Sequence, residues 1–502
     1  MGERDEARQA RVVIIGTGFS GVGMAIELKR SGINDFIVLE KADEIGGTWR
    51  DNSYPGCACD IPSHMYSFSF ALNPDWSRCY APWHEIQRYL LDVTDRYGVR
   101  EHIRFGVNVT GSRWDADEQA WHVHTADGTE YVGRFLVSGI GGLHIPSIPD
   151  LPGLDRFQGA RFHSARWNHD YDLTGRRVAV IGTGASAIQI VPSIAPTVAK
   201  LSLFQRTPPW IMPKNDHPTP DRARRLFRLL PPARRAYRAY LYWALEARAL
   251  GFNGHPWMTR FGESVARRYL RQRIADPGLR RELTPHYRLG CKRVLLTNDY
   301  YPALTRDNVD LVTDRIAEVR EHSIVTADGT EHDVDAIIFG TGFHVTDSFE
   351  NLDILGADGR SLSKEWTANG IRTHLGITVS GFPNLFFLLG PNTSLGHHSV
   401  VFMIESQIRY VAKAIGLVER AGAGALDVRA SVRDAFQRDL QRRLARGVWT
   451  TGGCTSWYLD SHGVNRTTWP GFTWRYWLET RTPRAADFEL IGRRPRTVAP
   501  TR

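Results

Sequence analysis

Two short apolar runs along the chain each lead directly into a glycine-rich turn and then into a helical pattern. The first is Arg11–Gly21 (RVVIIGTGFSG) and the second is Arg177–Ala187 (RVAVIGTGASA). A β-branched run this short between turn signals is typical of a buried parallel strand. Two such units predict an α/β fold with two Rossmann-like dinucleotide-binding domains.

Alternating patterns elsewhere predict further strands. Trp121–Thr125 and Tyr131–Ser138 flank an Asp-Gly turn, and Ser323–Thr326 precedes a similar turn and the apolar run Val334–Phe339. Each pattern ends in a turn of small residues. We expect the chain to pass between domains at these turns.

The stretch 219–285 differs from its surroundings because it is rich in Arg, Ala, Leu and aromatic residues, and it predicts a helical insertion, with a helix over 234–250. We expect its aromatic residues to form a core. The alternative is an amphipathic face that contacts a membrane surface or an apolar substrate. A helix is expected over Val400–Val411, and 485–502 lacks apolar periodicity, which predicts a loosely held tail.

The composition is that of a globular protein of two to four domains: 502 residues, 42% hydrophobic and 23% charged. The net charge of +9 is compatible with nucleic acid, with anionic small molecules or with an Arg-rich surface. Because no compact basic block carries interleaved aromatic residues, we expect no nucleic-acid partner. No run of 18 or more apolar residues and no apolar leader core occurs, so a cytoplasmic protein without a membrane span is expected.

Neither the cysteines nor the paired histidines match a known metal or disulfide pattern. The five cysteines are Cys57, Cys59, Cys79, Cys291 and Cys454, and we expect reduced thiols. Adjacent histidines such as His397-His398 cannot face one ion from a helix or a strand. We therefore expect no metal and interpret that pair as part of a loop before a helix.

Gly16, Gly18 and Gly21 form the first glycine motif. Gly16 permits the turn, Gly18 the close approach of a pyrophosphate to the helix N-terminus, and Gly21 the packing of helix on strand. The next apolar strand ends in Glu40, about 20 positions on, where a carboxylate accepts hydrogen bonds from ribose hydroxyls. This site suits the adenosine half of FAD or NAD.

The second motif repeats the device with Gly182, Gly184 and Ala187. Here the following strand ends in Gln205-Arg206-Thr207 instead of an acid. A guanidinium binds a 2′-phosphate that a carboxylate would repel, so this site is expected to prefer NADPH over NADH. Two dinucleotide sites in one chain predict an FAD–NADPH oxidoreductase. No redox-active cysteine spacing is present, which favours a monooxygenase over a disulfide reductase.

Two longer motifs resemble the fingerprints of the Baeyer–Villiger monooxygenases. One is F-x-G-x-x-x-H-x-x-x-W, formed by Phe157, Gly159, His163 and Trp167, and followed here by Asn168 where the family often has Pro or Asp. The other runs from Gly46-Gly47-Thr48-Trp49 through Tyr54-Pro55-Gly56 to Asp60. The resemblance extends over nearly the whole chain and implies FAD and NADPH as cofactors.

The resemblance also implies roles for single residues. Arg293 is similar to the family's active-site arginine, Asp60 to the carboxylate that holds it, and Lys292 to a second contact with the 2′-phosphate. Trp457 resembles a tryptophan near the nicotinamide ribose, and the His163 motif belongs to an interdomain linker. Further expected cofactor contacts are Gly47, Trp49, Gln189 and Thr207.

The implied reaction converts a ketone and O₂ into an ester or lactone through a C4a-peroxyflavin. A permanently charged guanidinium suits it because negative charge develops on oxygen. A flavin-dependent N- or S-hydroxylating monooxygenase is the alternative enzyme, against which Trp167, Asp60 and Arg293 discriminate. A catalytically silent dinucleotide-binding protein is the alternative of another class.

The patterns and the resemblance together predict a division of the chain into two interleaved domains. An FAD-binding domain takes residues 1–148 and 345–502, with the tail at its end. An NADPH-binding domain takes 149–214 and 285–344, and the helical insertion lies between its parts at 215–284.

Overall fold

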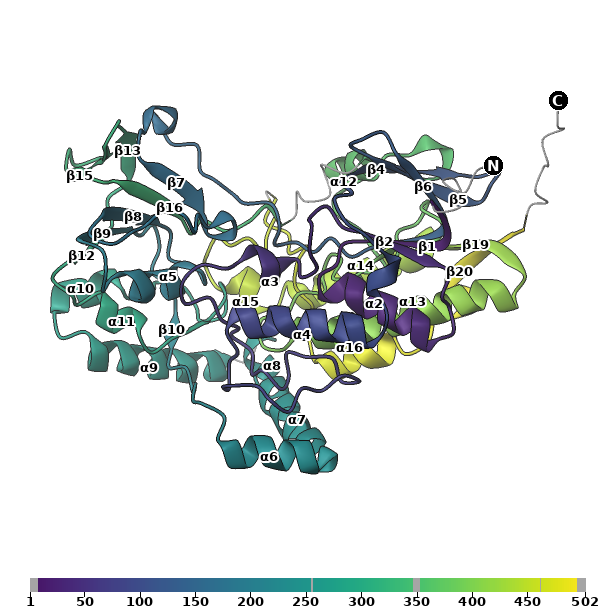
Figure 1. Ribbon diagram of the computed structural model, residues 1–502, viewed down its shortest axis with the longest axis horizontal. Helices are drawn as coiled ribbons and strands as arrows, with labels where there is room; N and C mark the ends of the chain where they lie inside the picture. Colours follow the sequence, from purple (N-terminus) through teal and green to yellow (C-terminus); the bar gives the residue numbers. More distant parts are fainter. Residues whose placement is uncertain (1–7, 254–255, 346–352, 461, 494–502) are drawn as a thin grey trace.

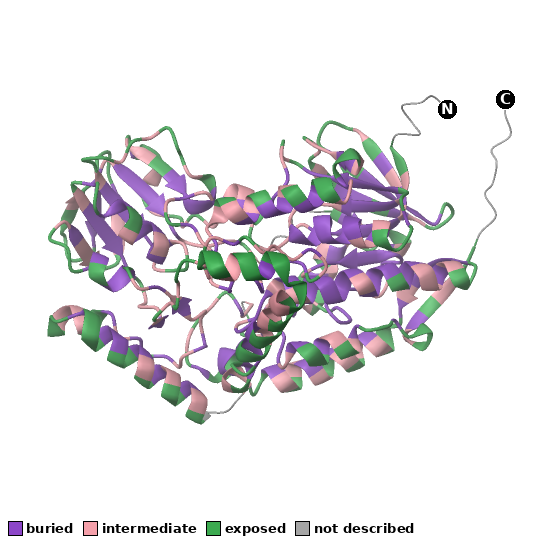
Figure 2. Ribbon diagram, turned by 60° about the horizontal axis from the view of Figure 1, so that its bottom comes forward, coloured by how far each residue is buried: buried purple, intermediate pink, exposed green. Residues whose placement is uncertain are grey.

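Two separate sheets organise the molecule. The computed structural model describes residues 8–253, 256–345, 353–460 and 462–493. The sheets lie at opposite ends of the long axis, and helices cover their faces (Figure 1). Their strands are buried, whereas the helices expose their outer sides (Figure 2).

The first sheet contains the first glycine turn. Its strand order is β17-β4-β5-β6-β1-β2-β3, and β18 pairs with β6. β1 lies parallel to both β2 and β6, while β4, β5 and β6 form antiparallel hairpins. Its strands are β1 (Gln9–Ile15), β2 (Phe36–Leu39), β3 (Ile103–Arg104), β4 (Val109–Asp115), β5 (Ala120–Thr125), β6 (Glu130–Ser138), β17 (Asp353–Leu355) and β18 (Leu385–Phe387).

The second sheet contains the second glycine turn and is parallel throughout, in the order β12-β9-β8-β16-β7. A small antiparallel sheet, β13-β14-β15, lies between β12 and β16 in the chain. The strands are β7 (Ala160–His163), β8 (Arg177–Ile181), β9 (Lys200–Phe204), β12 (Val309–Val312), β13 (Ile316–Val319), β14 (Ser323–Thr326), β15 (Glu331–Asp333) and β16 (Ala336–Phe339).

The chain leaves the first sheet after β6, builds the second, and returns to the first at β17. The predicted α/β class with two Rossmann-like units is confirmed, because each β-branched run is a buried parallel strand: Val12, Val13 and Ile14 are inaccessible to solvent. The predicted domain boundaries stay predictions.

Helices connect and cover the sheets. The glycine turns are followed by α2 (Phe19–Arg30) and α5 (Ala187–Ile194), and α13 (Val400–Arg420) packs on α2. The others are α3 (Thr48–Asp51), α4 (Trp83–Arg96), α6 (Asp221–Leu229), α7 (Pro231–Glu246), α8 (Ala249–Phe252), α9 (Pro256–Arg273), α10 (Pro277–Glu282), α11 (Tyr300–Ala303), α12 (Leu362–Asn369), α14 (Ala430–Leu444), α15 (Val448–Thr451) and α16 (Thr473–Glu479). No helix in the described ranges is both long and apolar enough to cross a bilayer.

Three local expectations are corrected. The helix expected over Val400–Val411 continues to Arg420. The stretch after 485 is not entirely a loose tail, because β20 (Phe488–Gly492) pairs antiparallel with β19 (Ala423–Val428), and 494–502 lies outside the described residues. Cys291 and Cys454 are not reduced thiols, because they form a disulfide with Cα atoms 6.2 Å apart. The two cysteines are 163 residues apart in sequence, so their spacing did not predict the bond.

Candidate active site

The first glycine turn is built by close backbone contacts. Gly16 has φ +95°, and a Cβ there would lie 2.8 Å from the carbonyl oxygen of Gly139. A Cβ on Gly21 would lie 1.8 Å from the Gly16 oxygen, and one on Gly47 would lie 3.1 Å from Cα of Gly18. Cβ atoms at Gly16 and Gly21 would clash with backbone atoms that pack against the turn, and Gly18 and Gly47 face each other closely. Glycine is therefore required for the tight turn before α2, and the binding of a pyrophosphate at that N-terminus stays a prediction.

Glu40 follows β2 and is buried beside this turn. Its carboxylate accepts hydrogen bonds from the amide and hydroxyl of Thr17, at 2.9 and 2.6 Å, and from the Ala42 amide at 3.0 Å. Burial alone would raise the pKa of Glu40, but the hydrogen bonds from Thr17 and Ala42 and the charge of Arg50 outweigh it and lower that pKa. An ionised acceptor is thus fixed next to the glycine turn.

The second glycine turn repeats the first in detail. Gly182 has φ +106°, and a Cβ there would lie 2.5 Å from the Gly340 oxygen. The Gly340 amide donates to the carbonyl of Ile181 at 2.9 Å, as Gly139 donates to Ile15 at 2.8 Å. In both units the turn of small residues that follows β6 or β16 therefore packs directly on the glycine turn. Ala187 begins α5 behind Gly182, and Gly184 has more open space than Gly182.

Two cations lie near each other at the edge of the second sheet. Arg206 follows β9 and is exposed, and the carbonyl of its neighbour Thr207 accepts from Thr183 at 3.0 Å. The ammonium of Lys292 lies 5.3 Å from the centre of the Tyr287 ring. Burial and the charge of Arg206 lower the pKa of Lys292, so the two cations are close enough to repel. A phosphate dianion between them would relieve that repulsion.

Arg293 and Asp60 form an ion pair across 233 residues of sequence. Nε and a terminal nitrogen of Arg293 lie 2.8 and 2.6 Å from the same carboxylate oxygen of Asp60. The charge of Asp60 raises the pKa of Arg293 further above its usual value. Both side chains keep about a third of their surface exposed, 32% and 28%. Arg293 therefore holds a fixed orientation and still presents part of its guanidinium to a ligand.

Tyr458 is a neighbour of Arg293 that the motifs did not reveal. Its hydroxyl is buried, and burial raises the pKa of Tyr458, while the charge of Arg293 acts in the opposite direction. The ring of the preceding residue, Trp457, lies tilted against that of Tyr458 with ring centres 4.4 Å apart, and Trp457 is 41% exposed. The segment that carries Trp457 thus lies beside Arg293. An aromatic pair late in the sequence was the available signal, and only Trp457 of that pair was assigned a role.

Gln189 ties the second unit to the loop that ends in Asp60. Its side-chain oxygen accepts from the hydroxyl of Tyr54 at 3.0 Å, and its nitrogen donates to the carbonyl of Ala58 at 3.0 Å. A Cβ on Gly56 would lie 2.6 Å from the Gln189 backbone oxygen. The long fingerprint therefore packs its loop onto α5. That loop begins at Gly47 beside Gly18, connects the two units, and ends at Asp60.

The short fingerprint forms the edge strand β7 and its exit. A Cβ on Gly159 would lie 2.4 Å from the Asp335 oxygen, so only glycine fits there. His163 pairs with Phe339 in the ladder and is buried, and burial lowers its pKa to about 4. Phe157 is buried, and Trp167 packs edge-on against Phe162.

Trp49, His397 and His398 are buried and contact other side chains of the protein. The indole of Trp49 donates to the hydroxyl of Tyr66 at 3.2 Å. His397 and His398 do precede a helix, but a carboxylate does face them: Glu246 of α7 lies 3.7 and 4.0 Å away. Glu246 also accepts from the hydroxyl of Thr473 at 2.9 Å. This cluster joins the helical insertion to the first unit.

The site can be compared with known proteins. The family model described as pyridine nucleotide-disulphide oxidoreductase matches residues 13–230. A Baeyer–Villiger monooxygenase of Streptomyces coelicolor is 49% identical over 500 residues, covering 99% of this chain and 96% of that protein. One of Pseudomonas aeruginosa is 49% identical, covering 96% and 92%.

Solved structures agree with these relatives. A steroid monooxygenase bound to NADP is 31% identical with a TM-score of 0.86, covering 96% of this chain and 99% of that one. A closed form of cyclohexanone monooxygenase is 28% identical with a TM-score of 0.87, covering 97% and 100%. Similarity therefore spans both dinucleotide-binding units and the helical insertion within the second unit.

Proposed function

Because the chain belongs to the Baeyer–Villiger monooxygenase family, we propose that it oxidises a ketone to an ester or lactone with O₂ and NADPH. The membership confirms the predicted family, the enzyme class of NADPH-dependent flavin monooxygenases, and the cofactors FAD and NADPH. The overall reaction consumes one ketone, one O₂, one NADPH and one proton, and gives the ester or lactone, NADP⁺ and water. The single observation that carries the proposal for this site is Arg293 held by its ion pair with Asp60.

The residues at the first turn fit FAD. Gly16 allows the tight turn before α2, Gly18 and Gly47 carry no side chains where they face each other, and the ionised Glu40 stands beside the turn as an acceptor for ribose hydroxyls. FAD, when bound, accepts a hydride from NADPH and activates O₂. In this chain those residues bind and orient the group.

The residues at the second turn fit NADPH. Gly182 and Gly184 leave the backbone open before α5, and Arg206 and Lys292 offer two charges to a 2′-phosphate. The Arg206 guanidinium can bind two phosphate oxygens at once, whereas Lys292 acts as a point charge. We therefore propose a preference for NADPH over NADH.

Arg293 is the group placed to stabilise negative charge on oxygen. Its guanidinium stays charged at every working pH, and Asp60 keeps it from turning away. Asp60 also offsets part of the desolvation of that charge. We propose that Arg293 donates hydrogen bonds to the oxygen on which charge develops when the carbonyl is attacked.

The decisive experiment is a ketone panel with the purified holoenzyme. Linear, cyclic and aromatic ketones are incubated with NADPH and O₂, and the ester or lactone is measured by mass spectrometry per NADPH oxidised. Oxidation of added amines or sulfides without any ester would instead identify an N- or S-hydroxylating enzyme. A bound flavin that NADPH does not bleach would identify a silent dinucleotide-binding protein.

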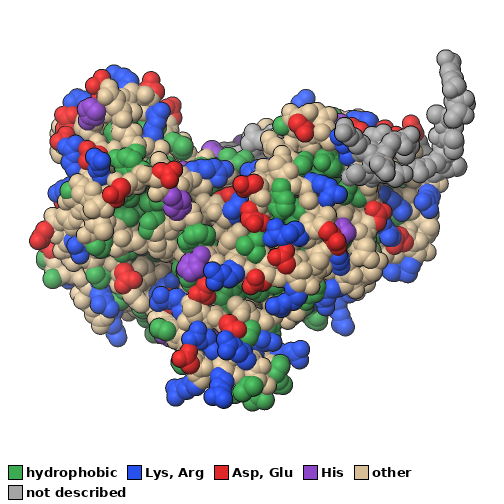
Figure 3. Space-filling view, viewed as in Figure 1, with side chains coloured by type: hydrophobic (Ala, Val, Ile, Leu, Met, Phe, Trp, Pro, Cys, Tyr) green, Lys and Arg blue, Asp and Glu red, His purple; other side chains and the backbone are tan. Residues whose placement is uncertain are grey.

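We further propose that the helical hairpin of α6 and α7 contacts an anionic lipid surface. The hairpin projects from the body, and Lys/Arg and hydrophobic side chains gather on it (Figure 3). Residues 221–246 contain seven arginines and two acidic residues. Arg222, Arg225 and Arg235 are exposed, and no ion pair to them occurs in the described part of the chain. The exposed large apolar side chains of the hairpin are Leu226, Leu229, Leu230, Tyr240 and Trp243.

Charge decides between the candidate occupants of this surface. A second copy would bring an equally basic hairpin against the first, whereas anionic headgroups attract each exposed arginine by about 1 kcal/mol. Exposed apolar side chains such as Leu229, which is 69% exposed, can then insert between the headgroups and the acyl chains of the lipid. The hairpin combines both features on one projection.

Vesicle sedimentation tests the lipid surface. Binding to phosphatidylcholine vesicles should rise when phosphatidylglycerol is added, and Leu229→Ser with Leu230→Ser should reduce it. The control Leu478→Ser changes an exposed leucine on α16 and should leave binding unchanged. Equal binding to neutral and anionic vesicles would overturn the proposal. A dimer in sedimentation velocity that Leu229→Ser dissolves would identify a second copy as the occupant.

A further inference from the structure

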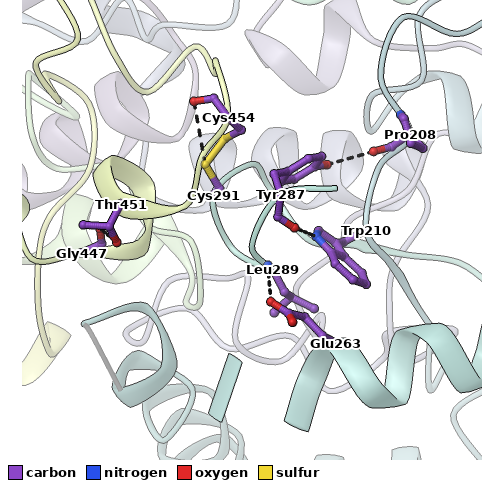
Figure 4. The surroundings of a disulfide bond; sticks show 9 residues. All are labelled: Pro208, Trp210, Glu263, Tyr287, Leu289, Cys291, Gly447, Thr451 and Cys454. Atoms are coloured by element: carbon purple, nitrogen blue, oxygen red, sulfur yellow. Dashed lines mark hydrogen bonds between the residues drawn. A yellow bond between two sulfur atoms is a disulfide. The ribbon is translucent and has the colours of Figure 1, made fainter. Parts of the chain in front are cut away.

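The Cys291–Cys454 disulfide connects the two segments that surround the candidate arginine. Cys291 immediately precedes Lys292 and Arg293, and Cys454 lies four residues before Tyr458. Cys291 is inaccessible to solvent, and Cys454 is half-buried. Figure 4 shows the bond joining the two segments to the left of Tyr287.

The same two segments touch at points on either side of the bond. The Arg288 amide donates to the carbonyl of Gly452 at 2.9 Å. A Cβ on Gly452 would lie 2.6 Å from Cβ of Cys291, so the backbones approach as closely as glycine permits. Beyond the bond, Arg293 lies beside Tyr458. The cross-link therefore sits in the middle of a contact that runs from Arg288 to Arg293.

The segment before Cys291 is anchored on the helical insertion and on the segment that follows β9. The Leu289 amide donates to Glu263 of α9 at 3.2 Å, and the Trp210 indole donates to the carbonyl of Tyr287 at 2.8 Å (Figure 4). After Cys291, the side-chain ion pair with Asp60 orients Arg293. The disulfide is thus the covalent link between this anchored segment and the one that carries Trp457 and Tyr458.

We propose that the Cys291–Cys454 disulfide is a reversible positioning element: when it is formed, Arg293 and Tyr458 are held for oxygen transfer, and when it is reduced, NADPH oxidation is uncoupled from product formation. This rests on the proposed function, because it concerns how efficiently that reaction uses NADPH. In a reducing compartment a disulfide beside an active site is typical of a redox-sensing element.

H₂O₂, which uncoupled turnover releases, is the oxidant that forms the disulfide again. Uncoupled turnover converts NADPH, a proton and O₂ into NADP⁺ and H₂O₂. H₂O₂ then oxidises the half-buried Cys454 thiol to a sulfenic acid and releases one water. The Cys291 thiol attacks that sulfur, which forms the disulfide and releases a second water. A cellular dithiol reverses the step and is itself oxidised, so H₂O₂ from uncoupled turnover restores the coupled form.

The test compares the holoenzyme as isolated, the holoenzyme reduced by dithiothreitol and desalted, and Cys454→Ser. Thiol titration after denaturation should give three thiols in the oxidised form, from Cys57, Cys59 and Cys79, and five in the reduced form. Product per NADPH should fall several-fold on reduction, while bound FAD and the rate of flavin reduction by NADPH stay the same. Trypsin should cleave after Lys292 faster in the reduced form. Added H₂O₂ should restore three thiols and the coupling.

Cys454→Ser should match the reduced holoenzyme and show no response to dithiothreitol. Cys79→Ser is the matched control and should keep the response, because Cys79 takes no part in the disulfide. Five thiols in the protein after peroxide treatment would overturn the proposal. So would unchanged coupling in a form shown to have five thiols. If the oxidised protein forms no ester from any ketone, the proposed function fails instead. That result is seen in the oxidised protein before any dithiothreitol is added, so it differs from a failure of the disulfide proposal.

Discussion

Replacing Arg293 with alanine removes the guanidinium that the ion pair with Asp60 orients. The two nitrogens of Arg293 lie 2.8 and 2.6 Å from one oxygen of Asp60, so the substitution removes a fixed charge and leaves the carboxylate without its partner. The Asp60 side chain keeps 28% of its surface exposed. Water can therefore solvate it, and we expect a stability change below about 1 kcal/mol.

The effect on oxygen transfer should be far larger than the effect on stability. A charge about 4 Å from a developing oxyanion contributes about 4 kcal/mol at an effective dielectric constant of about 20. Loss of a single donor to an oxyanion lowers kcat by about 10²–10³. Arg293→Ala should therefore fold, bind FAD and be reduced by NADPH, while ester or lactone falls by about that factor and H₂O₂ accounts for the NADPH consumed.

The assay measures product per NADPH oxidised, with H₂O₂ determined in parallel and FAD content checked by absorbance. Arg293→Lys should restore little of the product formed per NADPH, because a point charge does not reproduce the planar guanidinium that binds Asp60. Asp60→Ala keeps the guanidinium but frees its orientation and should give a milder loss. Near-stoichiometric ester from Arg293→Ala would refute the reasoning, and another cation would have to stabilise the oxyanion.

Three further predictions address the cofactor site, the fold and pH. Arg206→Ala should raise the KM for NADPH at least tenfold and leave that for NADH nearly unchanged; equal losses in steady-state assays would argue against a 2′-phosphate contact. Gly159→Ala should lower the free energy of unfolding by about 1–3 kcal/mol, seen as a lower Tm, because its Cβ would lie 2.4 Å from the Asp335 oxygen; an unchanged Tm would contradict this packing. Burial lowers the pKa of several histidines in the folded protein, and of four of them to about 4 or below, so the unfolded chain takes up protons first and stability is lost as pH falls from 6.5 toward 4; a Tm that is flat over this range would contradict the assignment. These histidines are His64, His163 and His374, with pKa values of about 4, and His398, with a pKa of about 3.

The sequence alone determined the features that local sterics and strand register control. A β-branched run before Gly16 must turn sharply into a helix, and the residue after the next strand, Glu40, must then lie at the same sheet edge. The same reasoning placed Arg206 beside the second turn, and both placements agree with the structure. The hairpin at Trp121–Thr125 also followed, because its turn and its alternation are adjacent in sequence.

The tertiary structure decided every contact between segments far apart in the chain. Arg293 and Asp60 are 233 residues apart, and only the resemblance to a family, not their spacing, suggested the pair. The Cys291–Cys454 disulfide had no local signal, and the aromatic pair Trp457-Tyr458 did not show that Tyr458 is buried beside Arg293. Periodicity describes one element at a time, whereas these contacts depend on how loops from two domains and an insertion meet. For the same physical reason β20 was missed, since its pairing with β19 becomes visible only once the chain has folded.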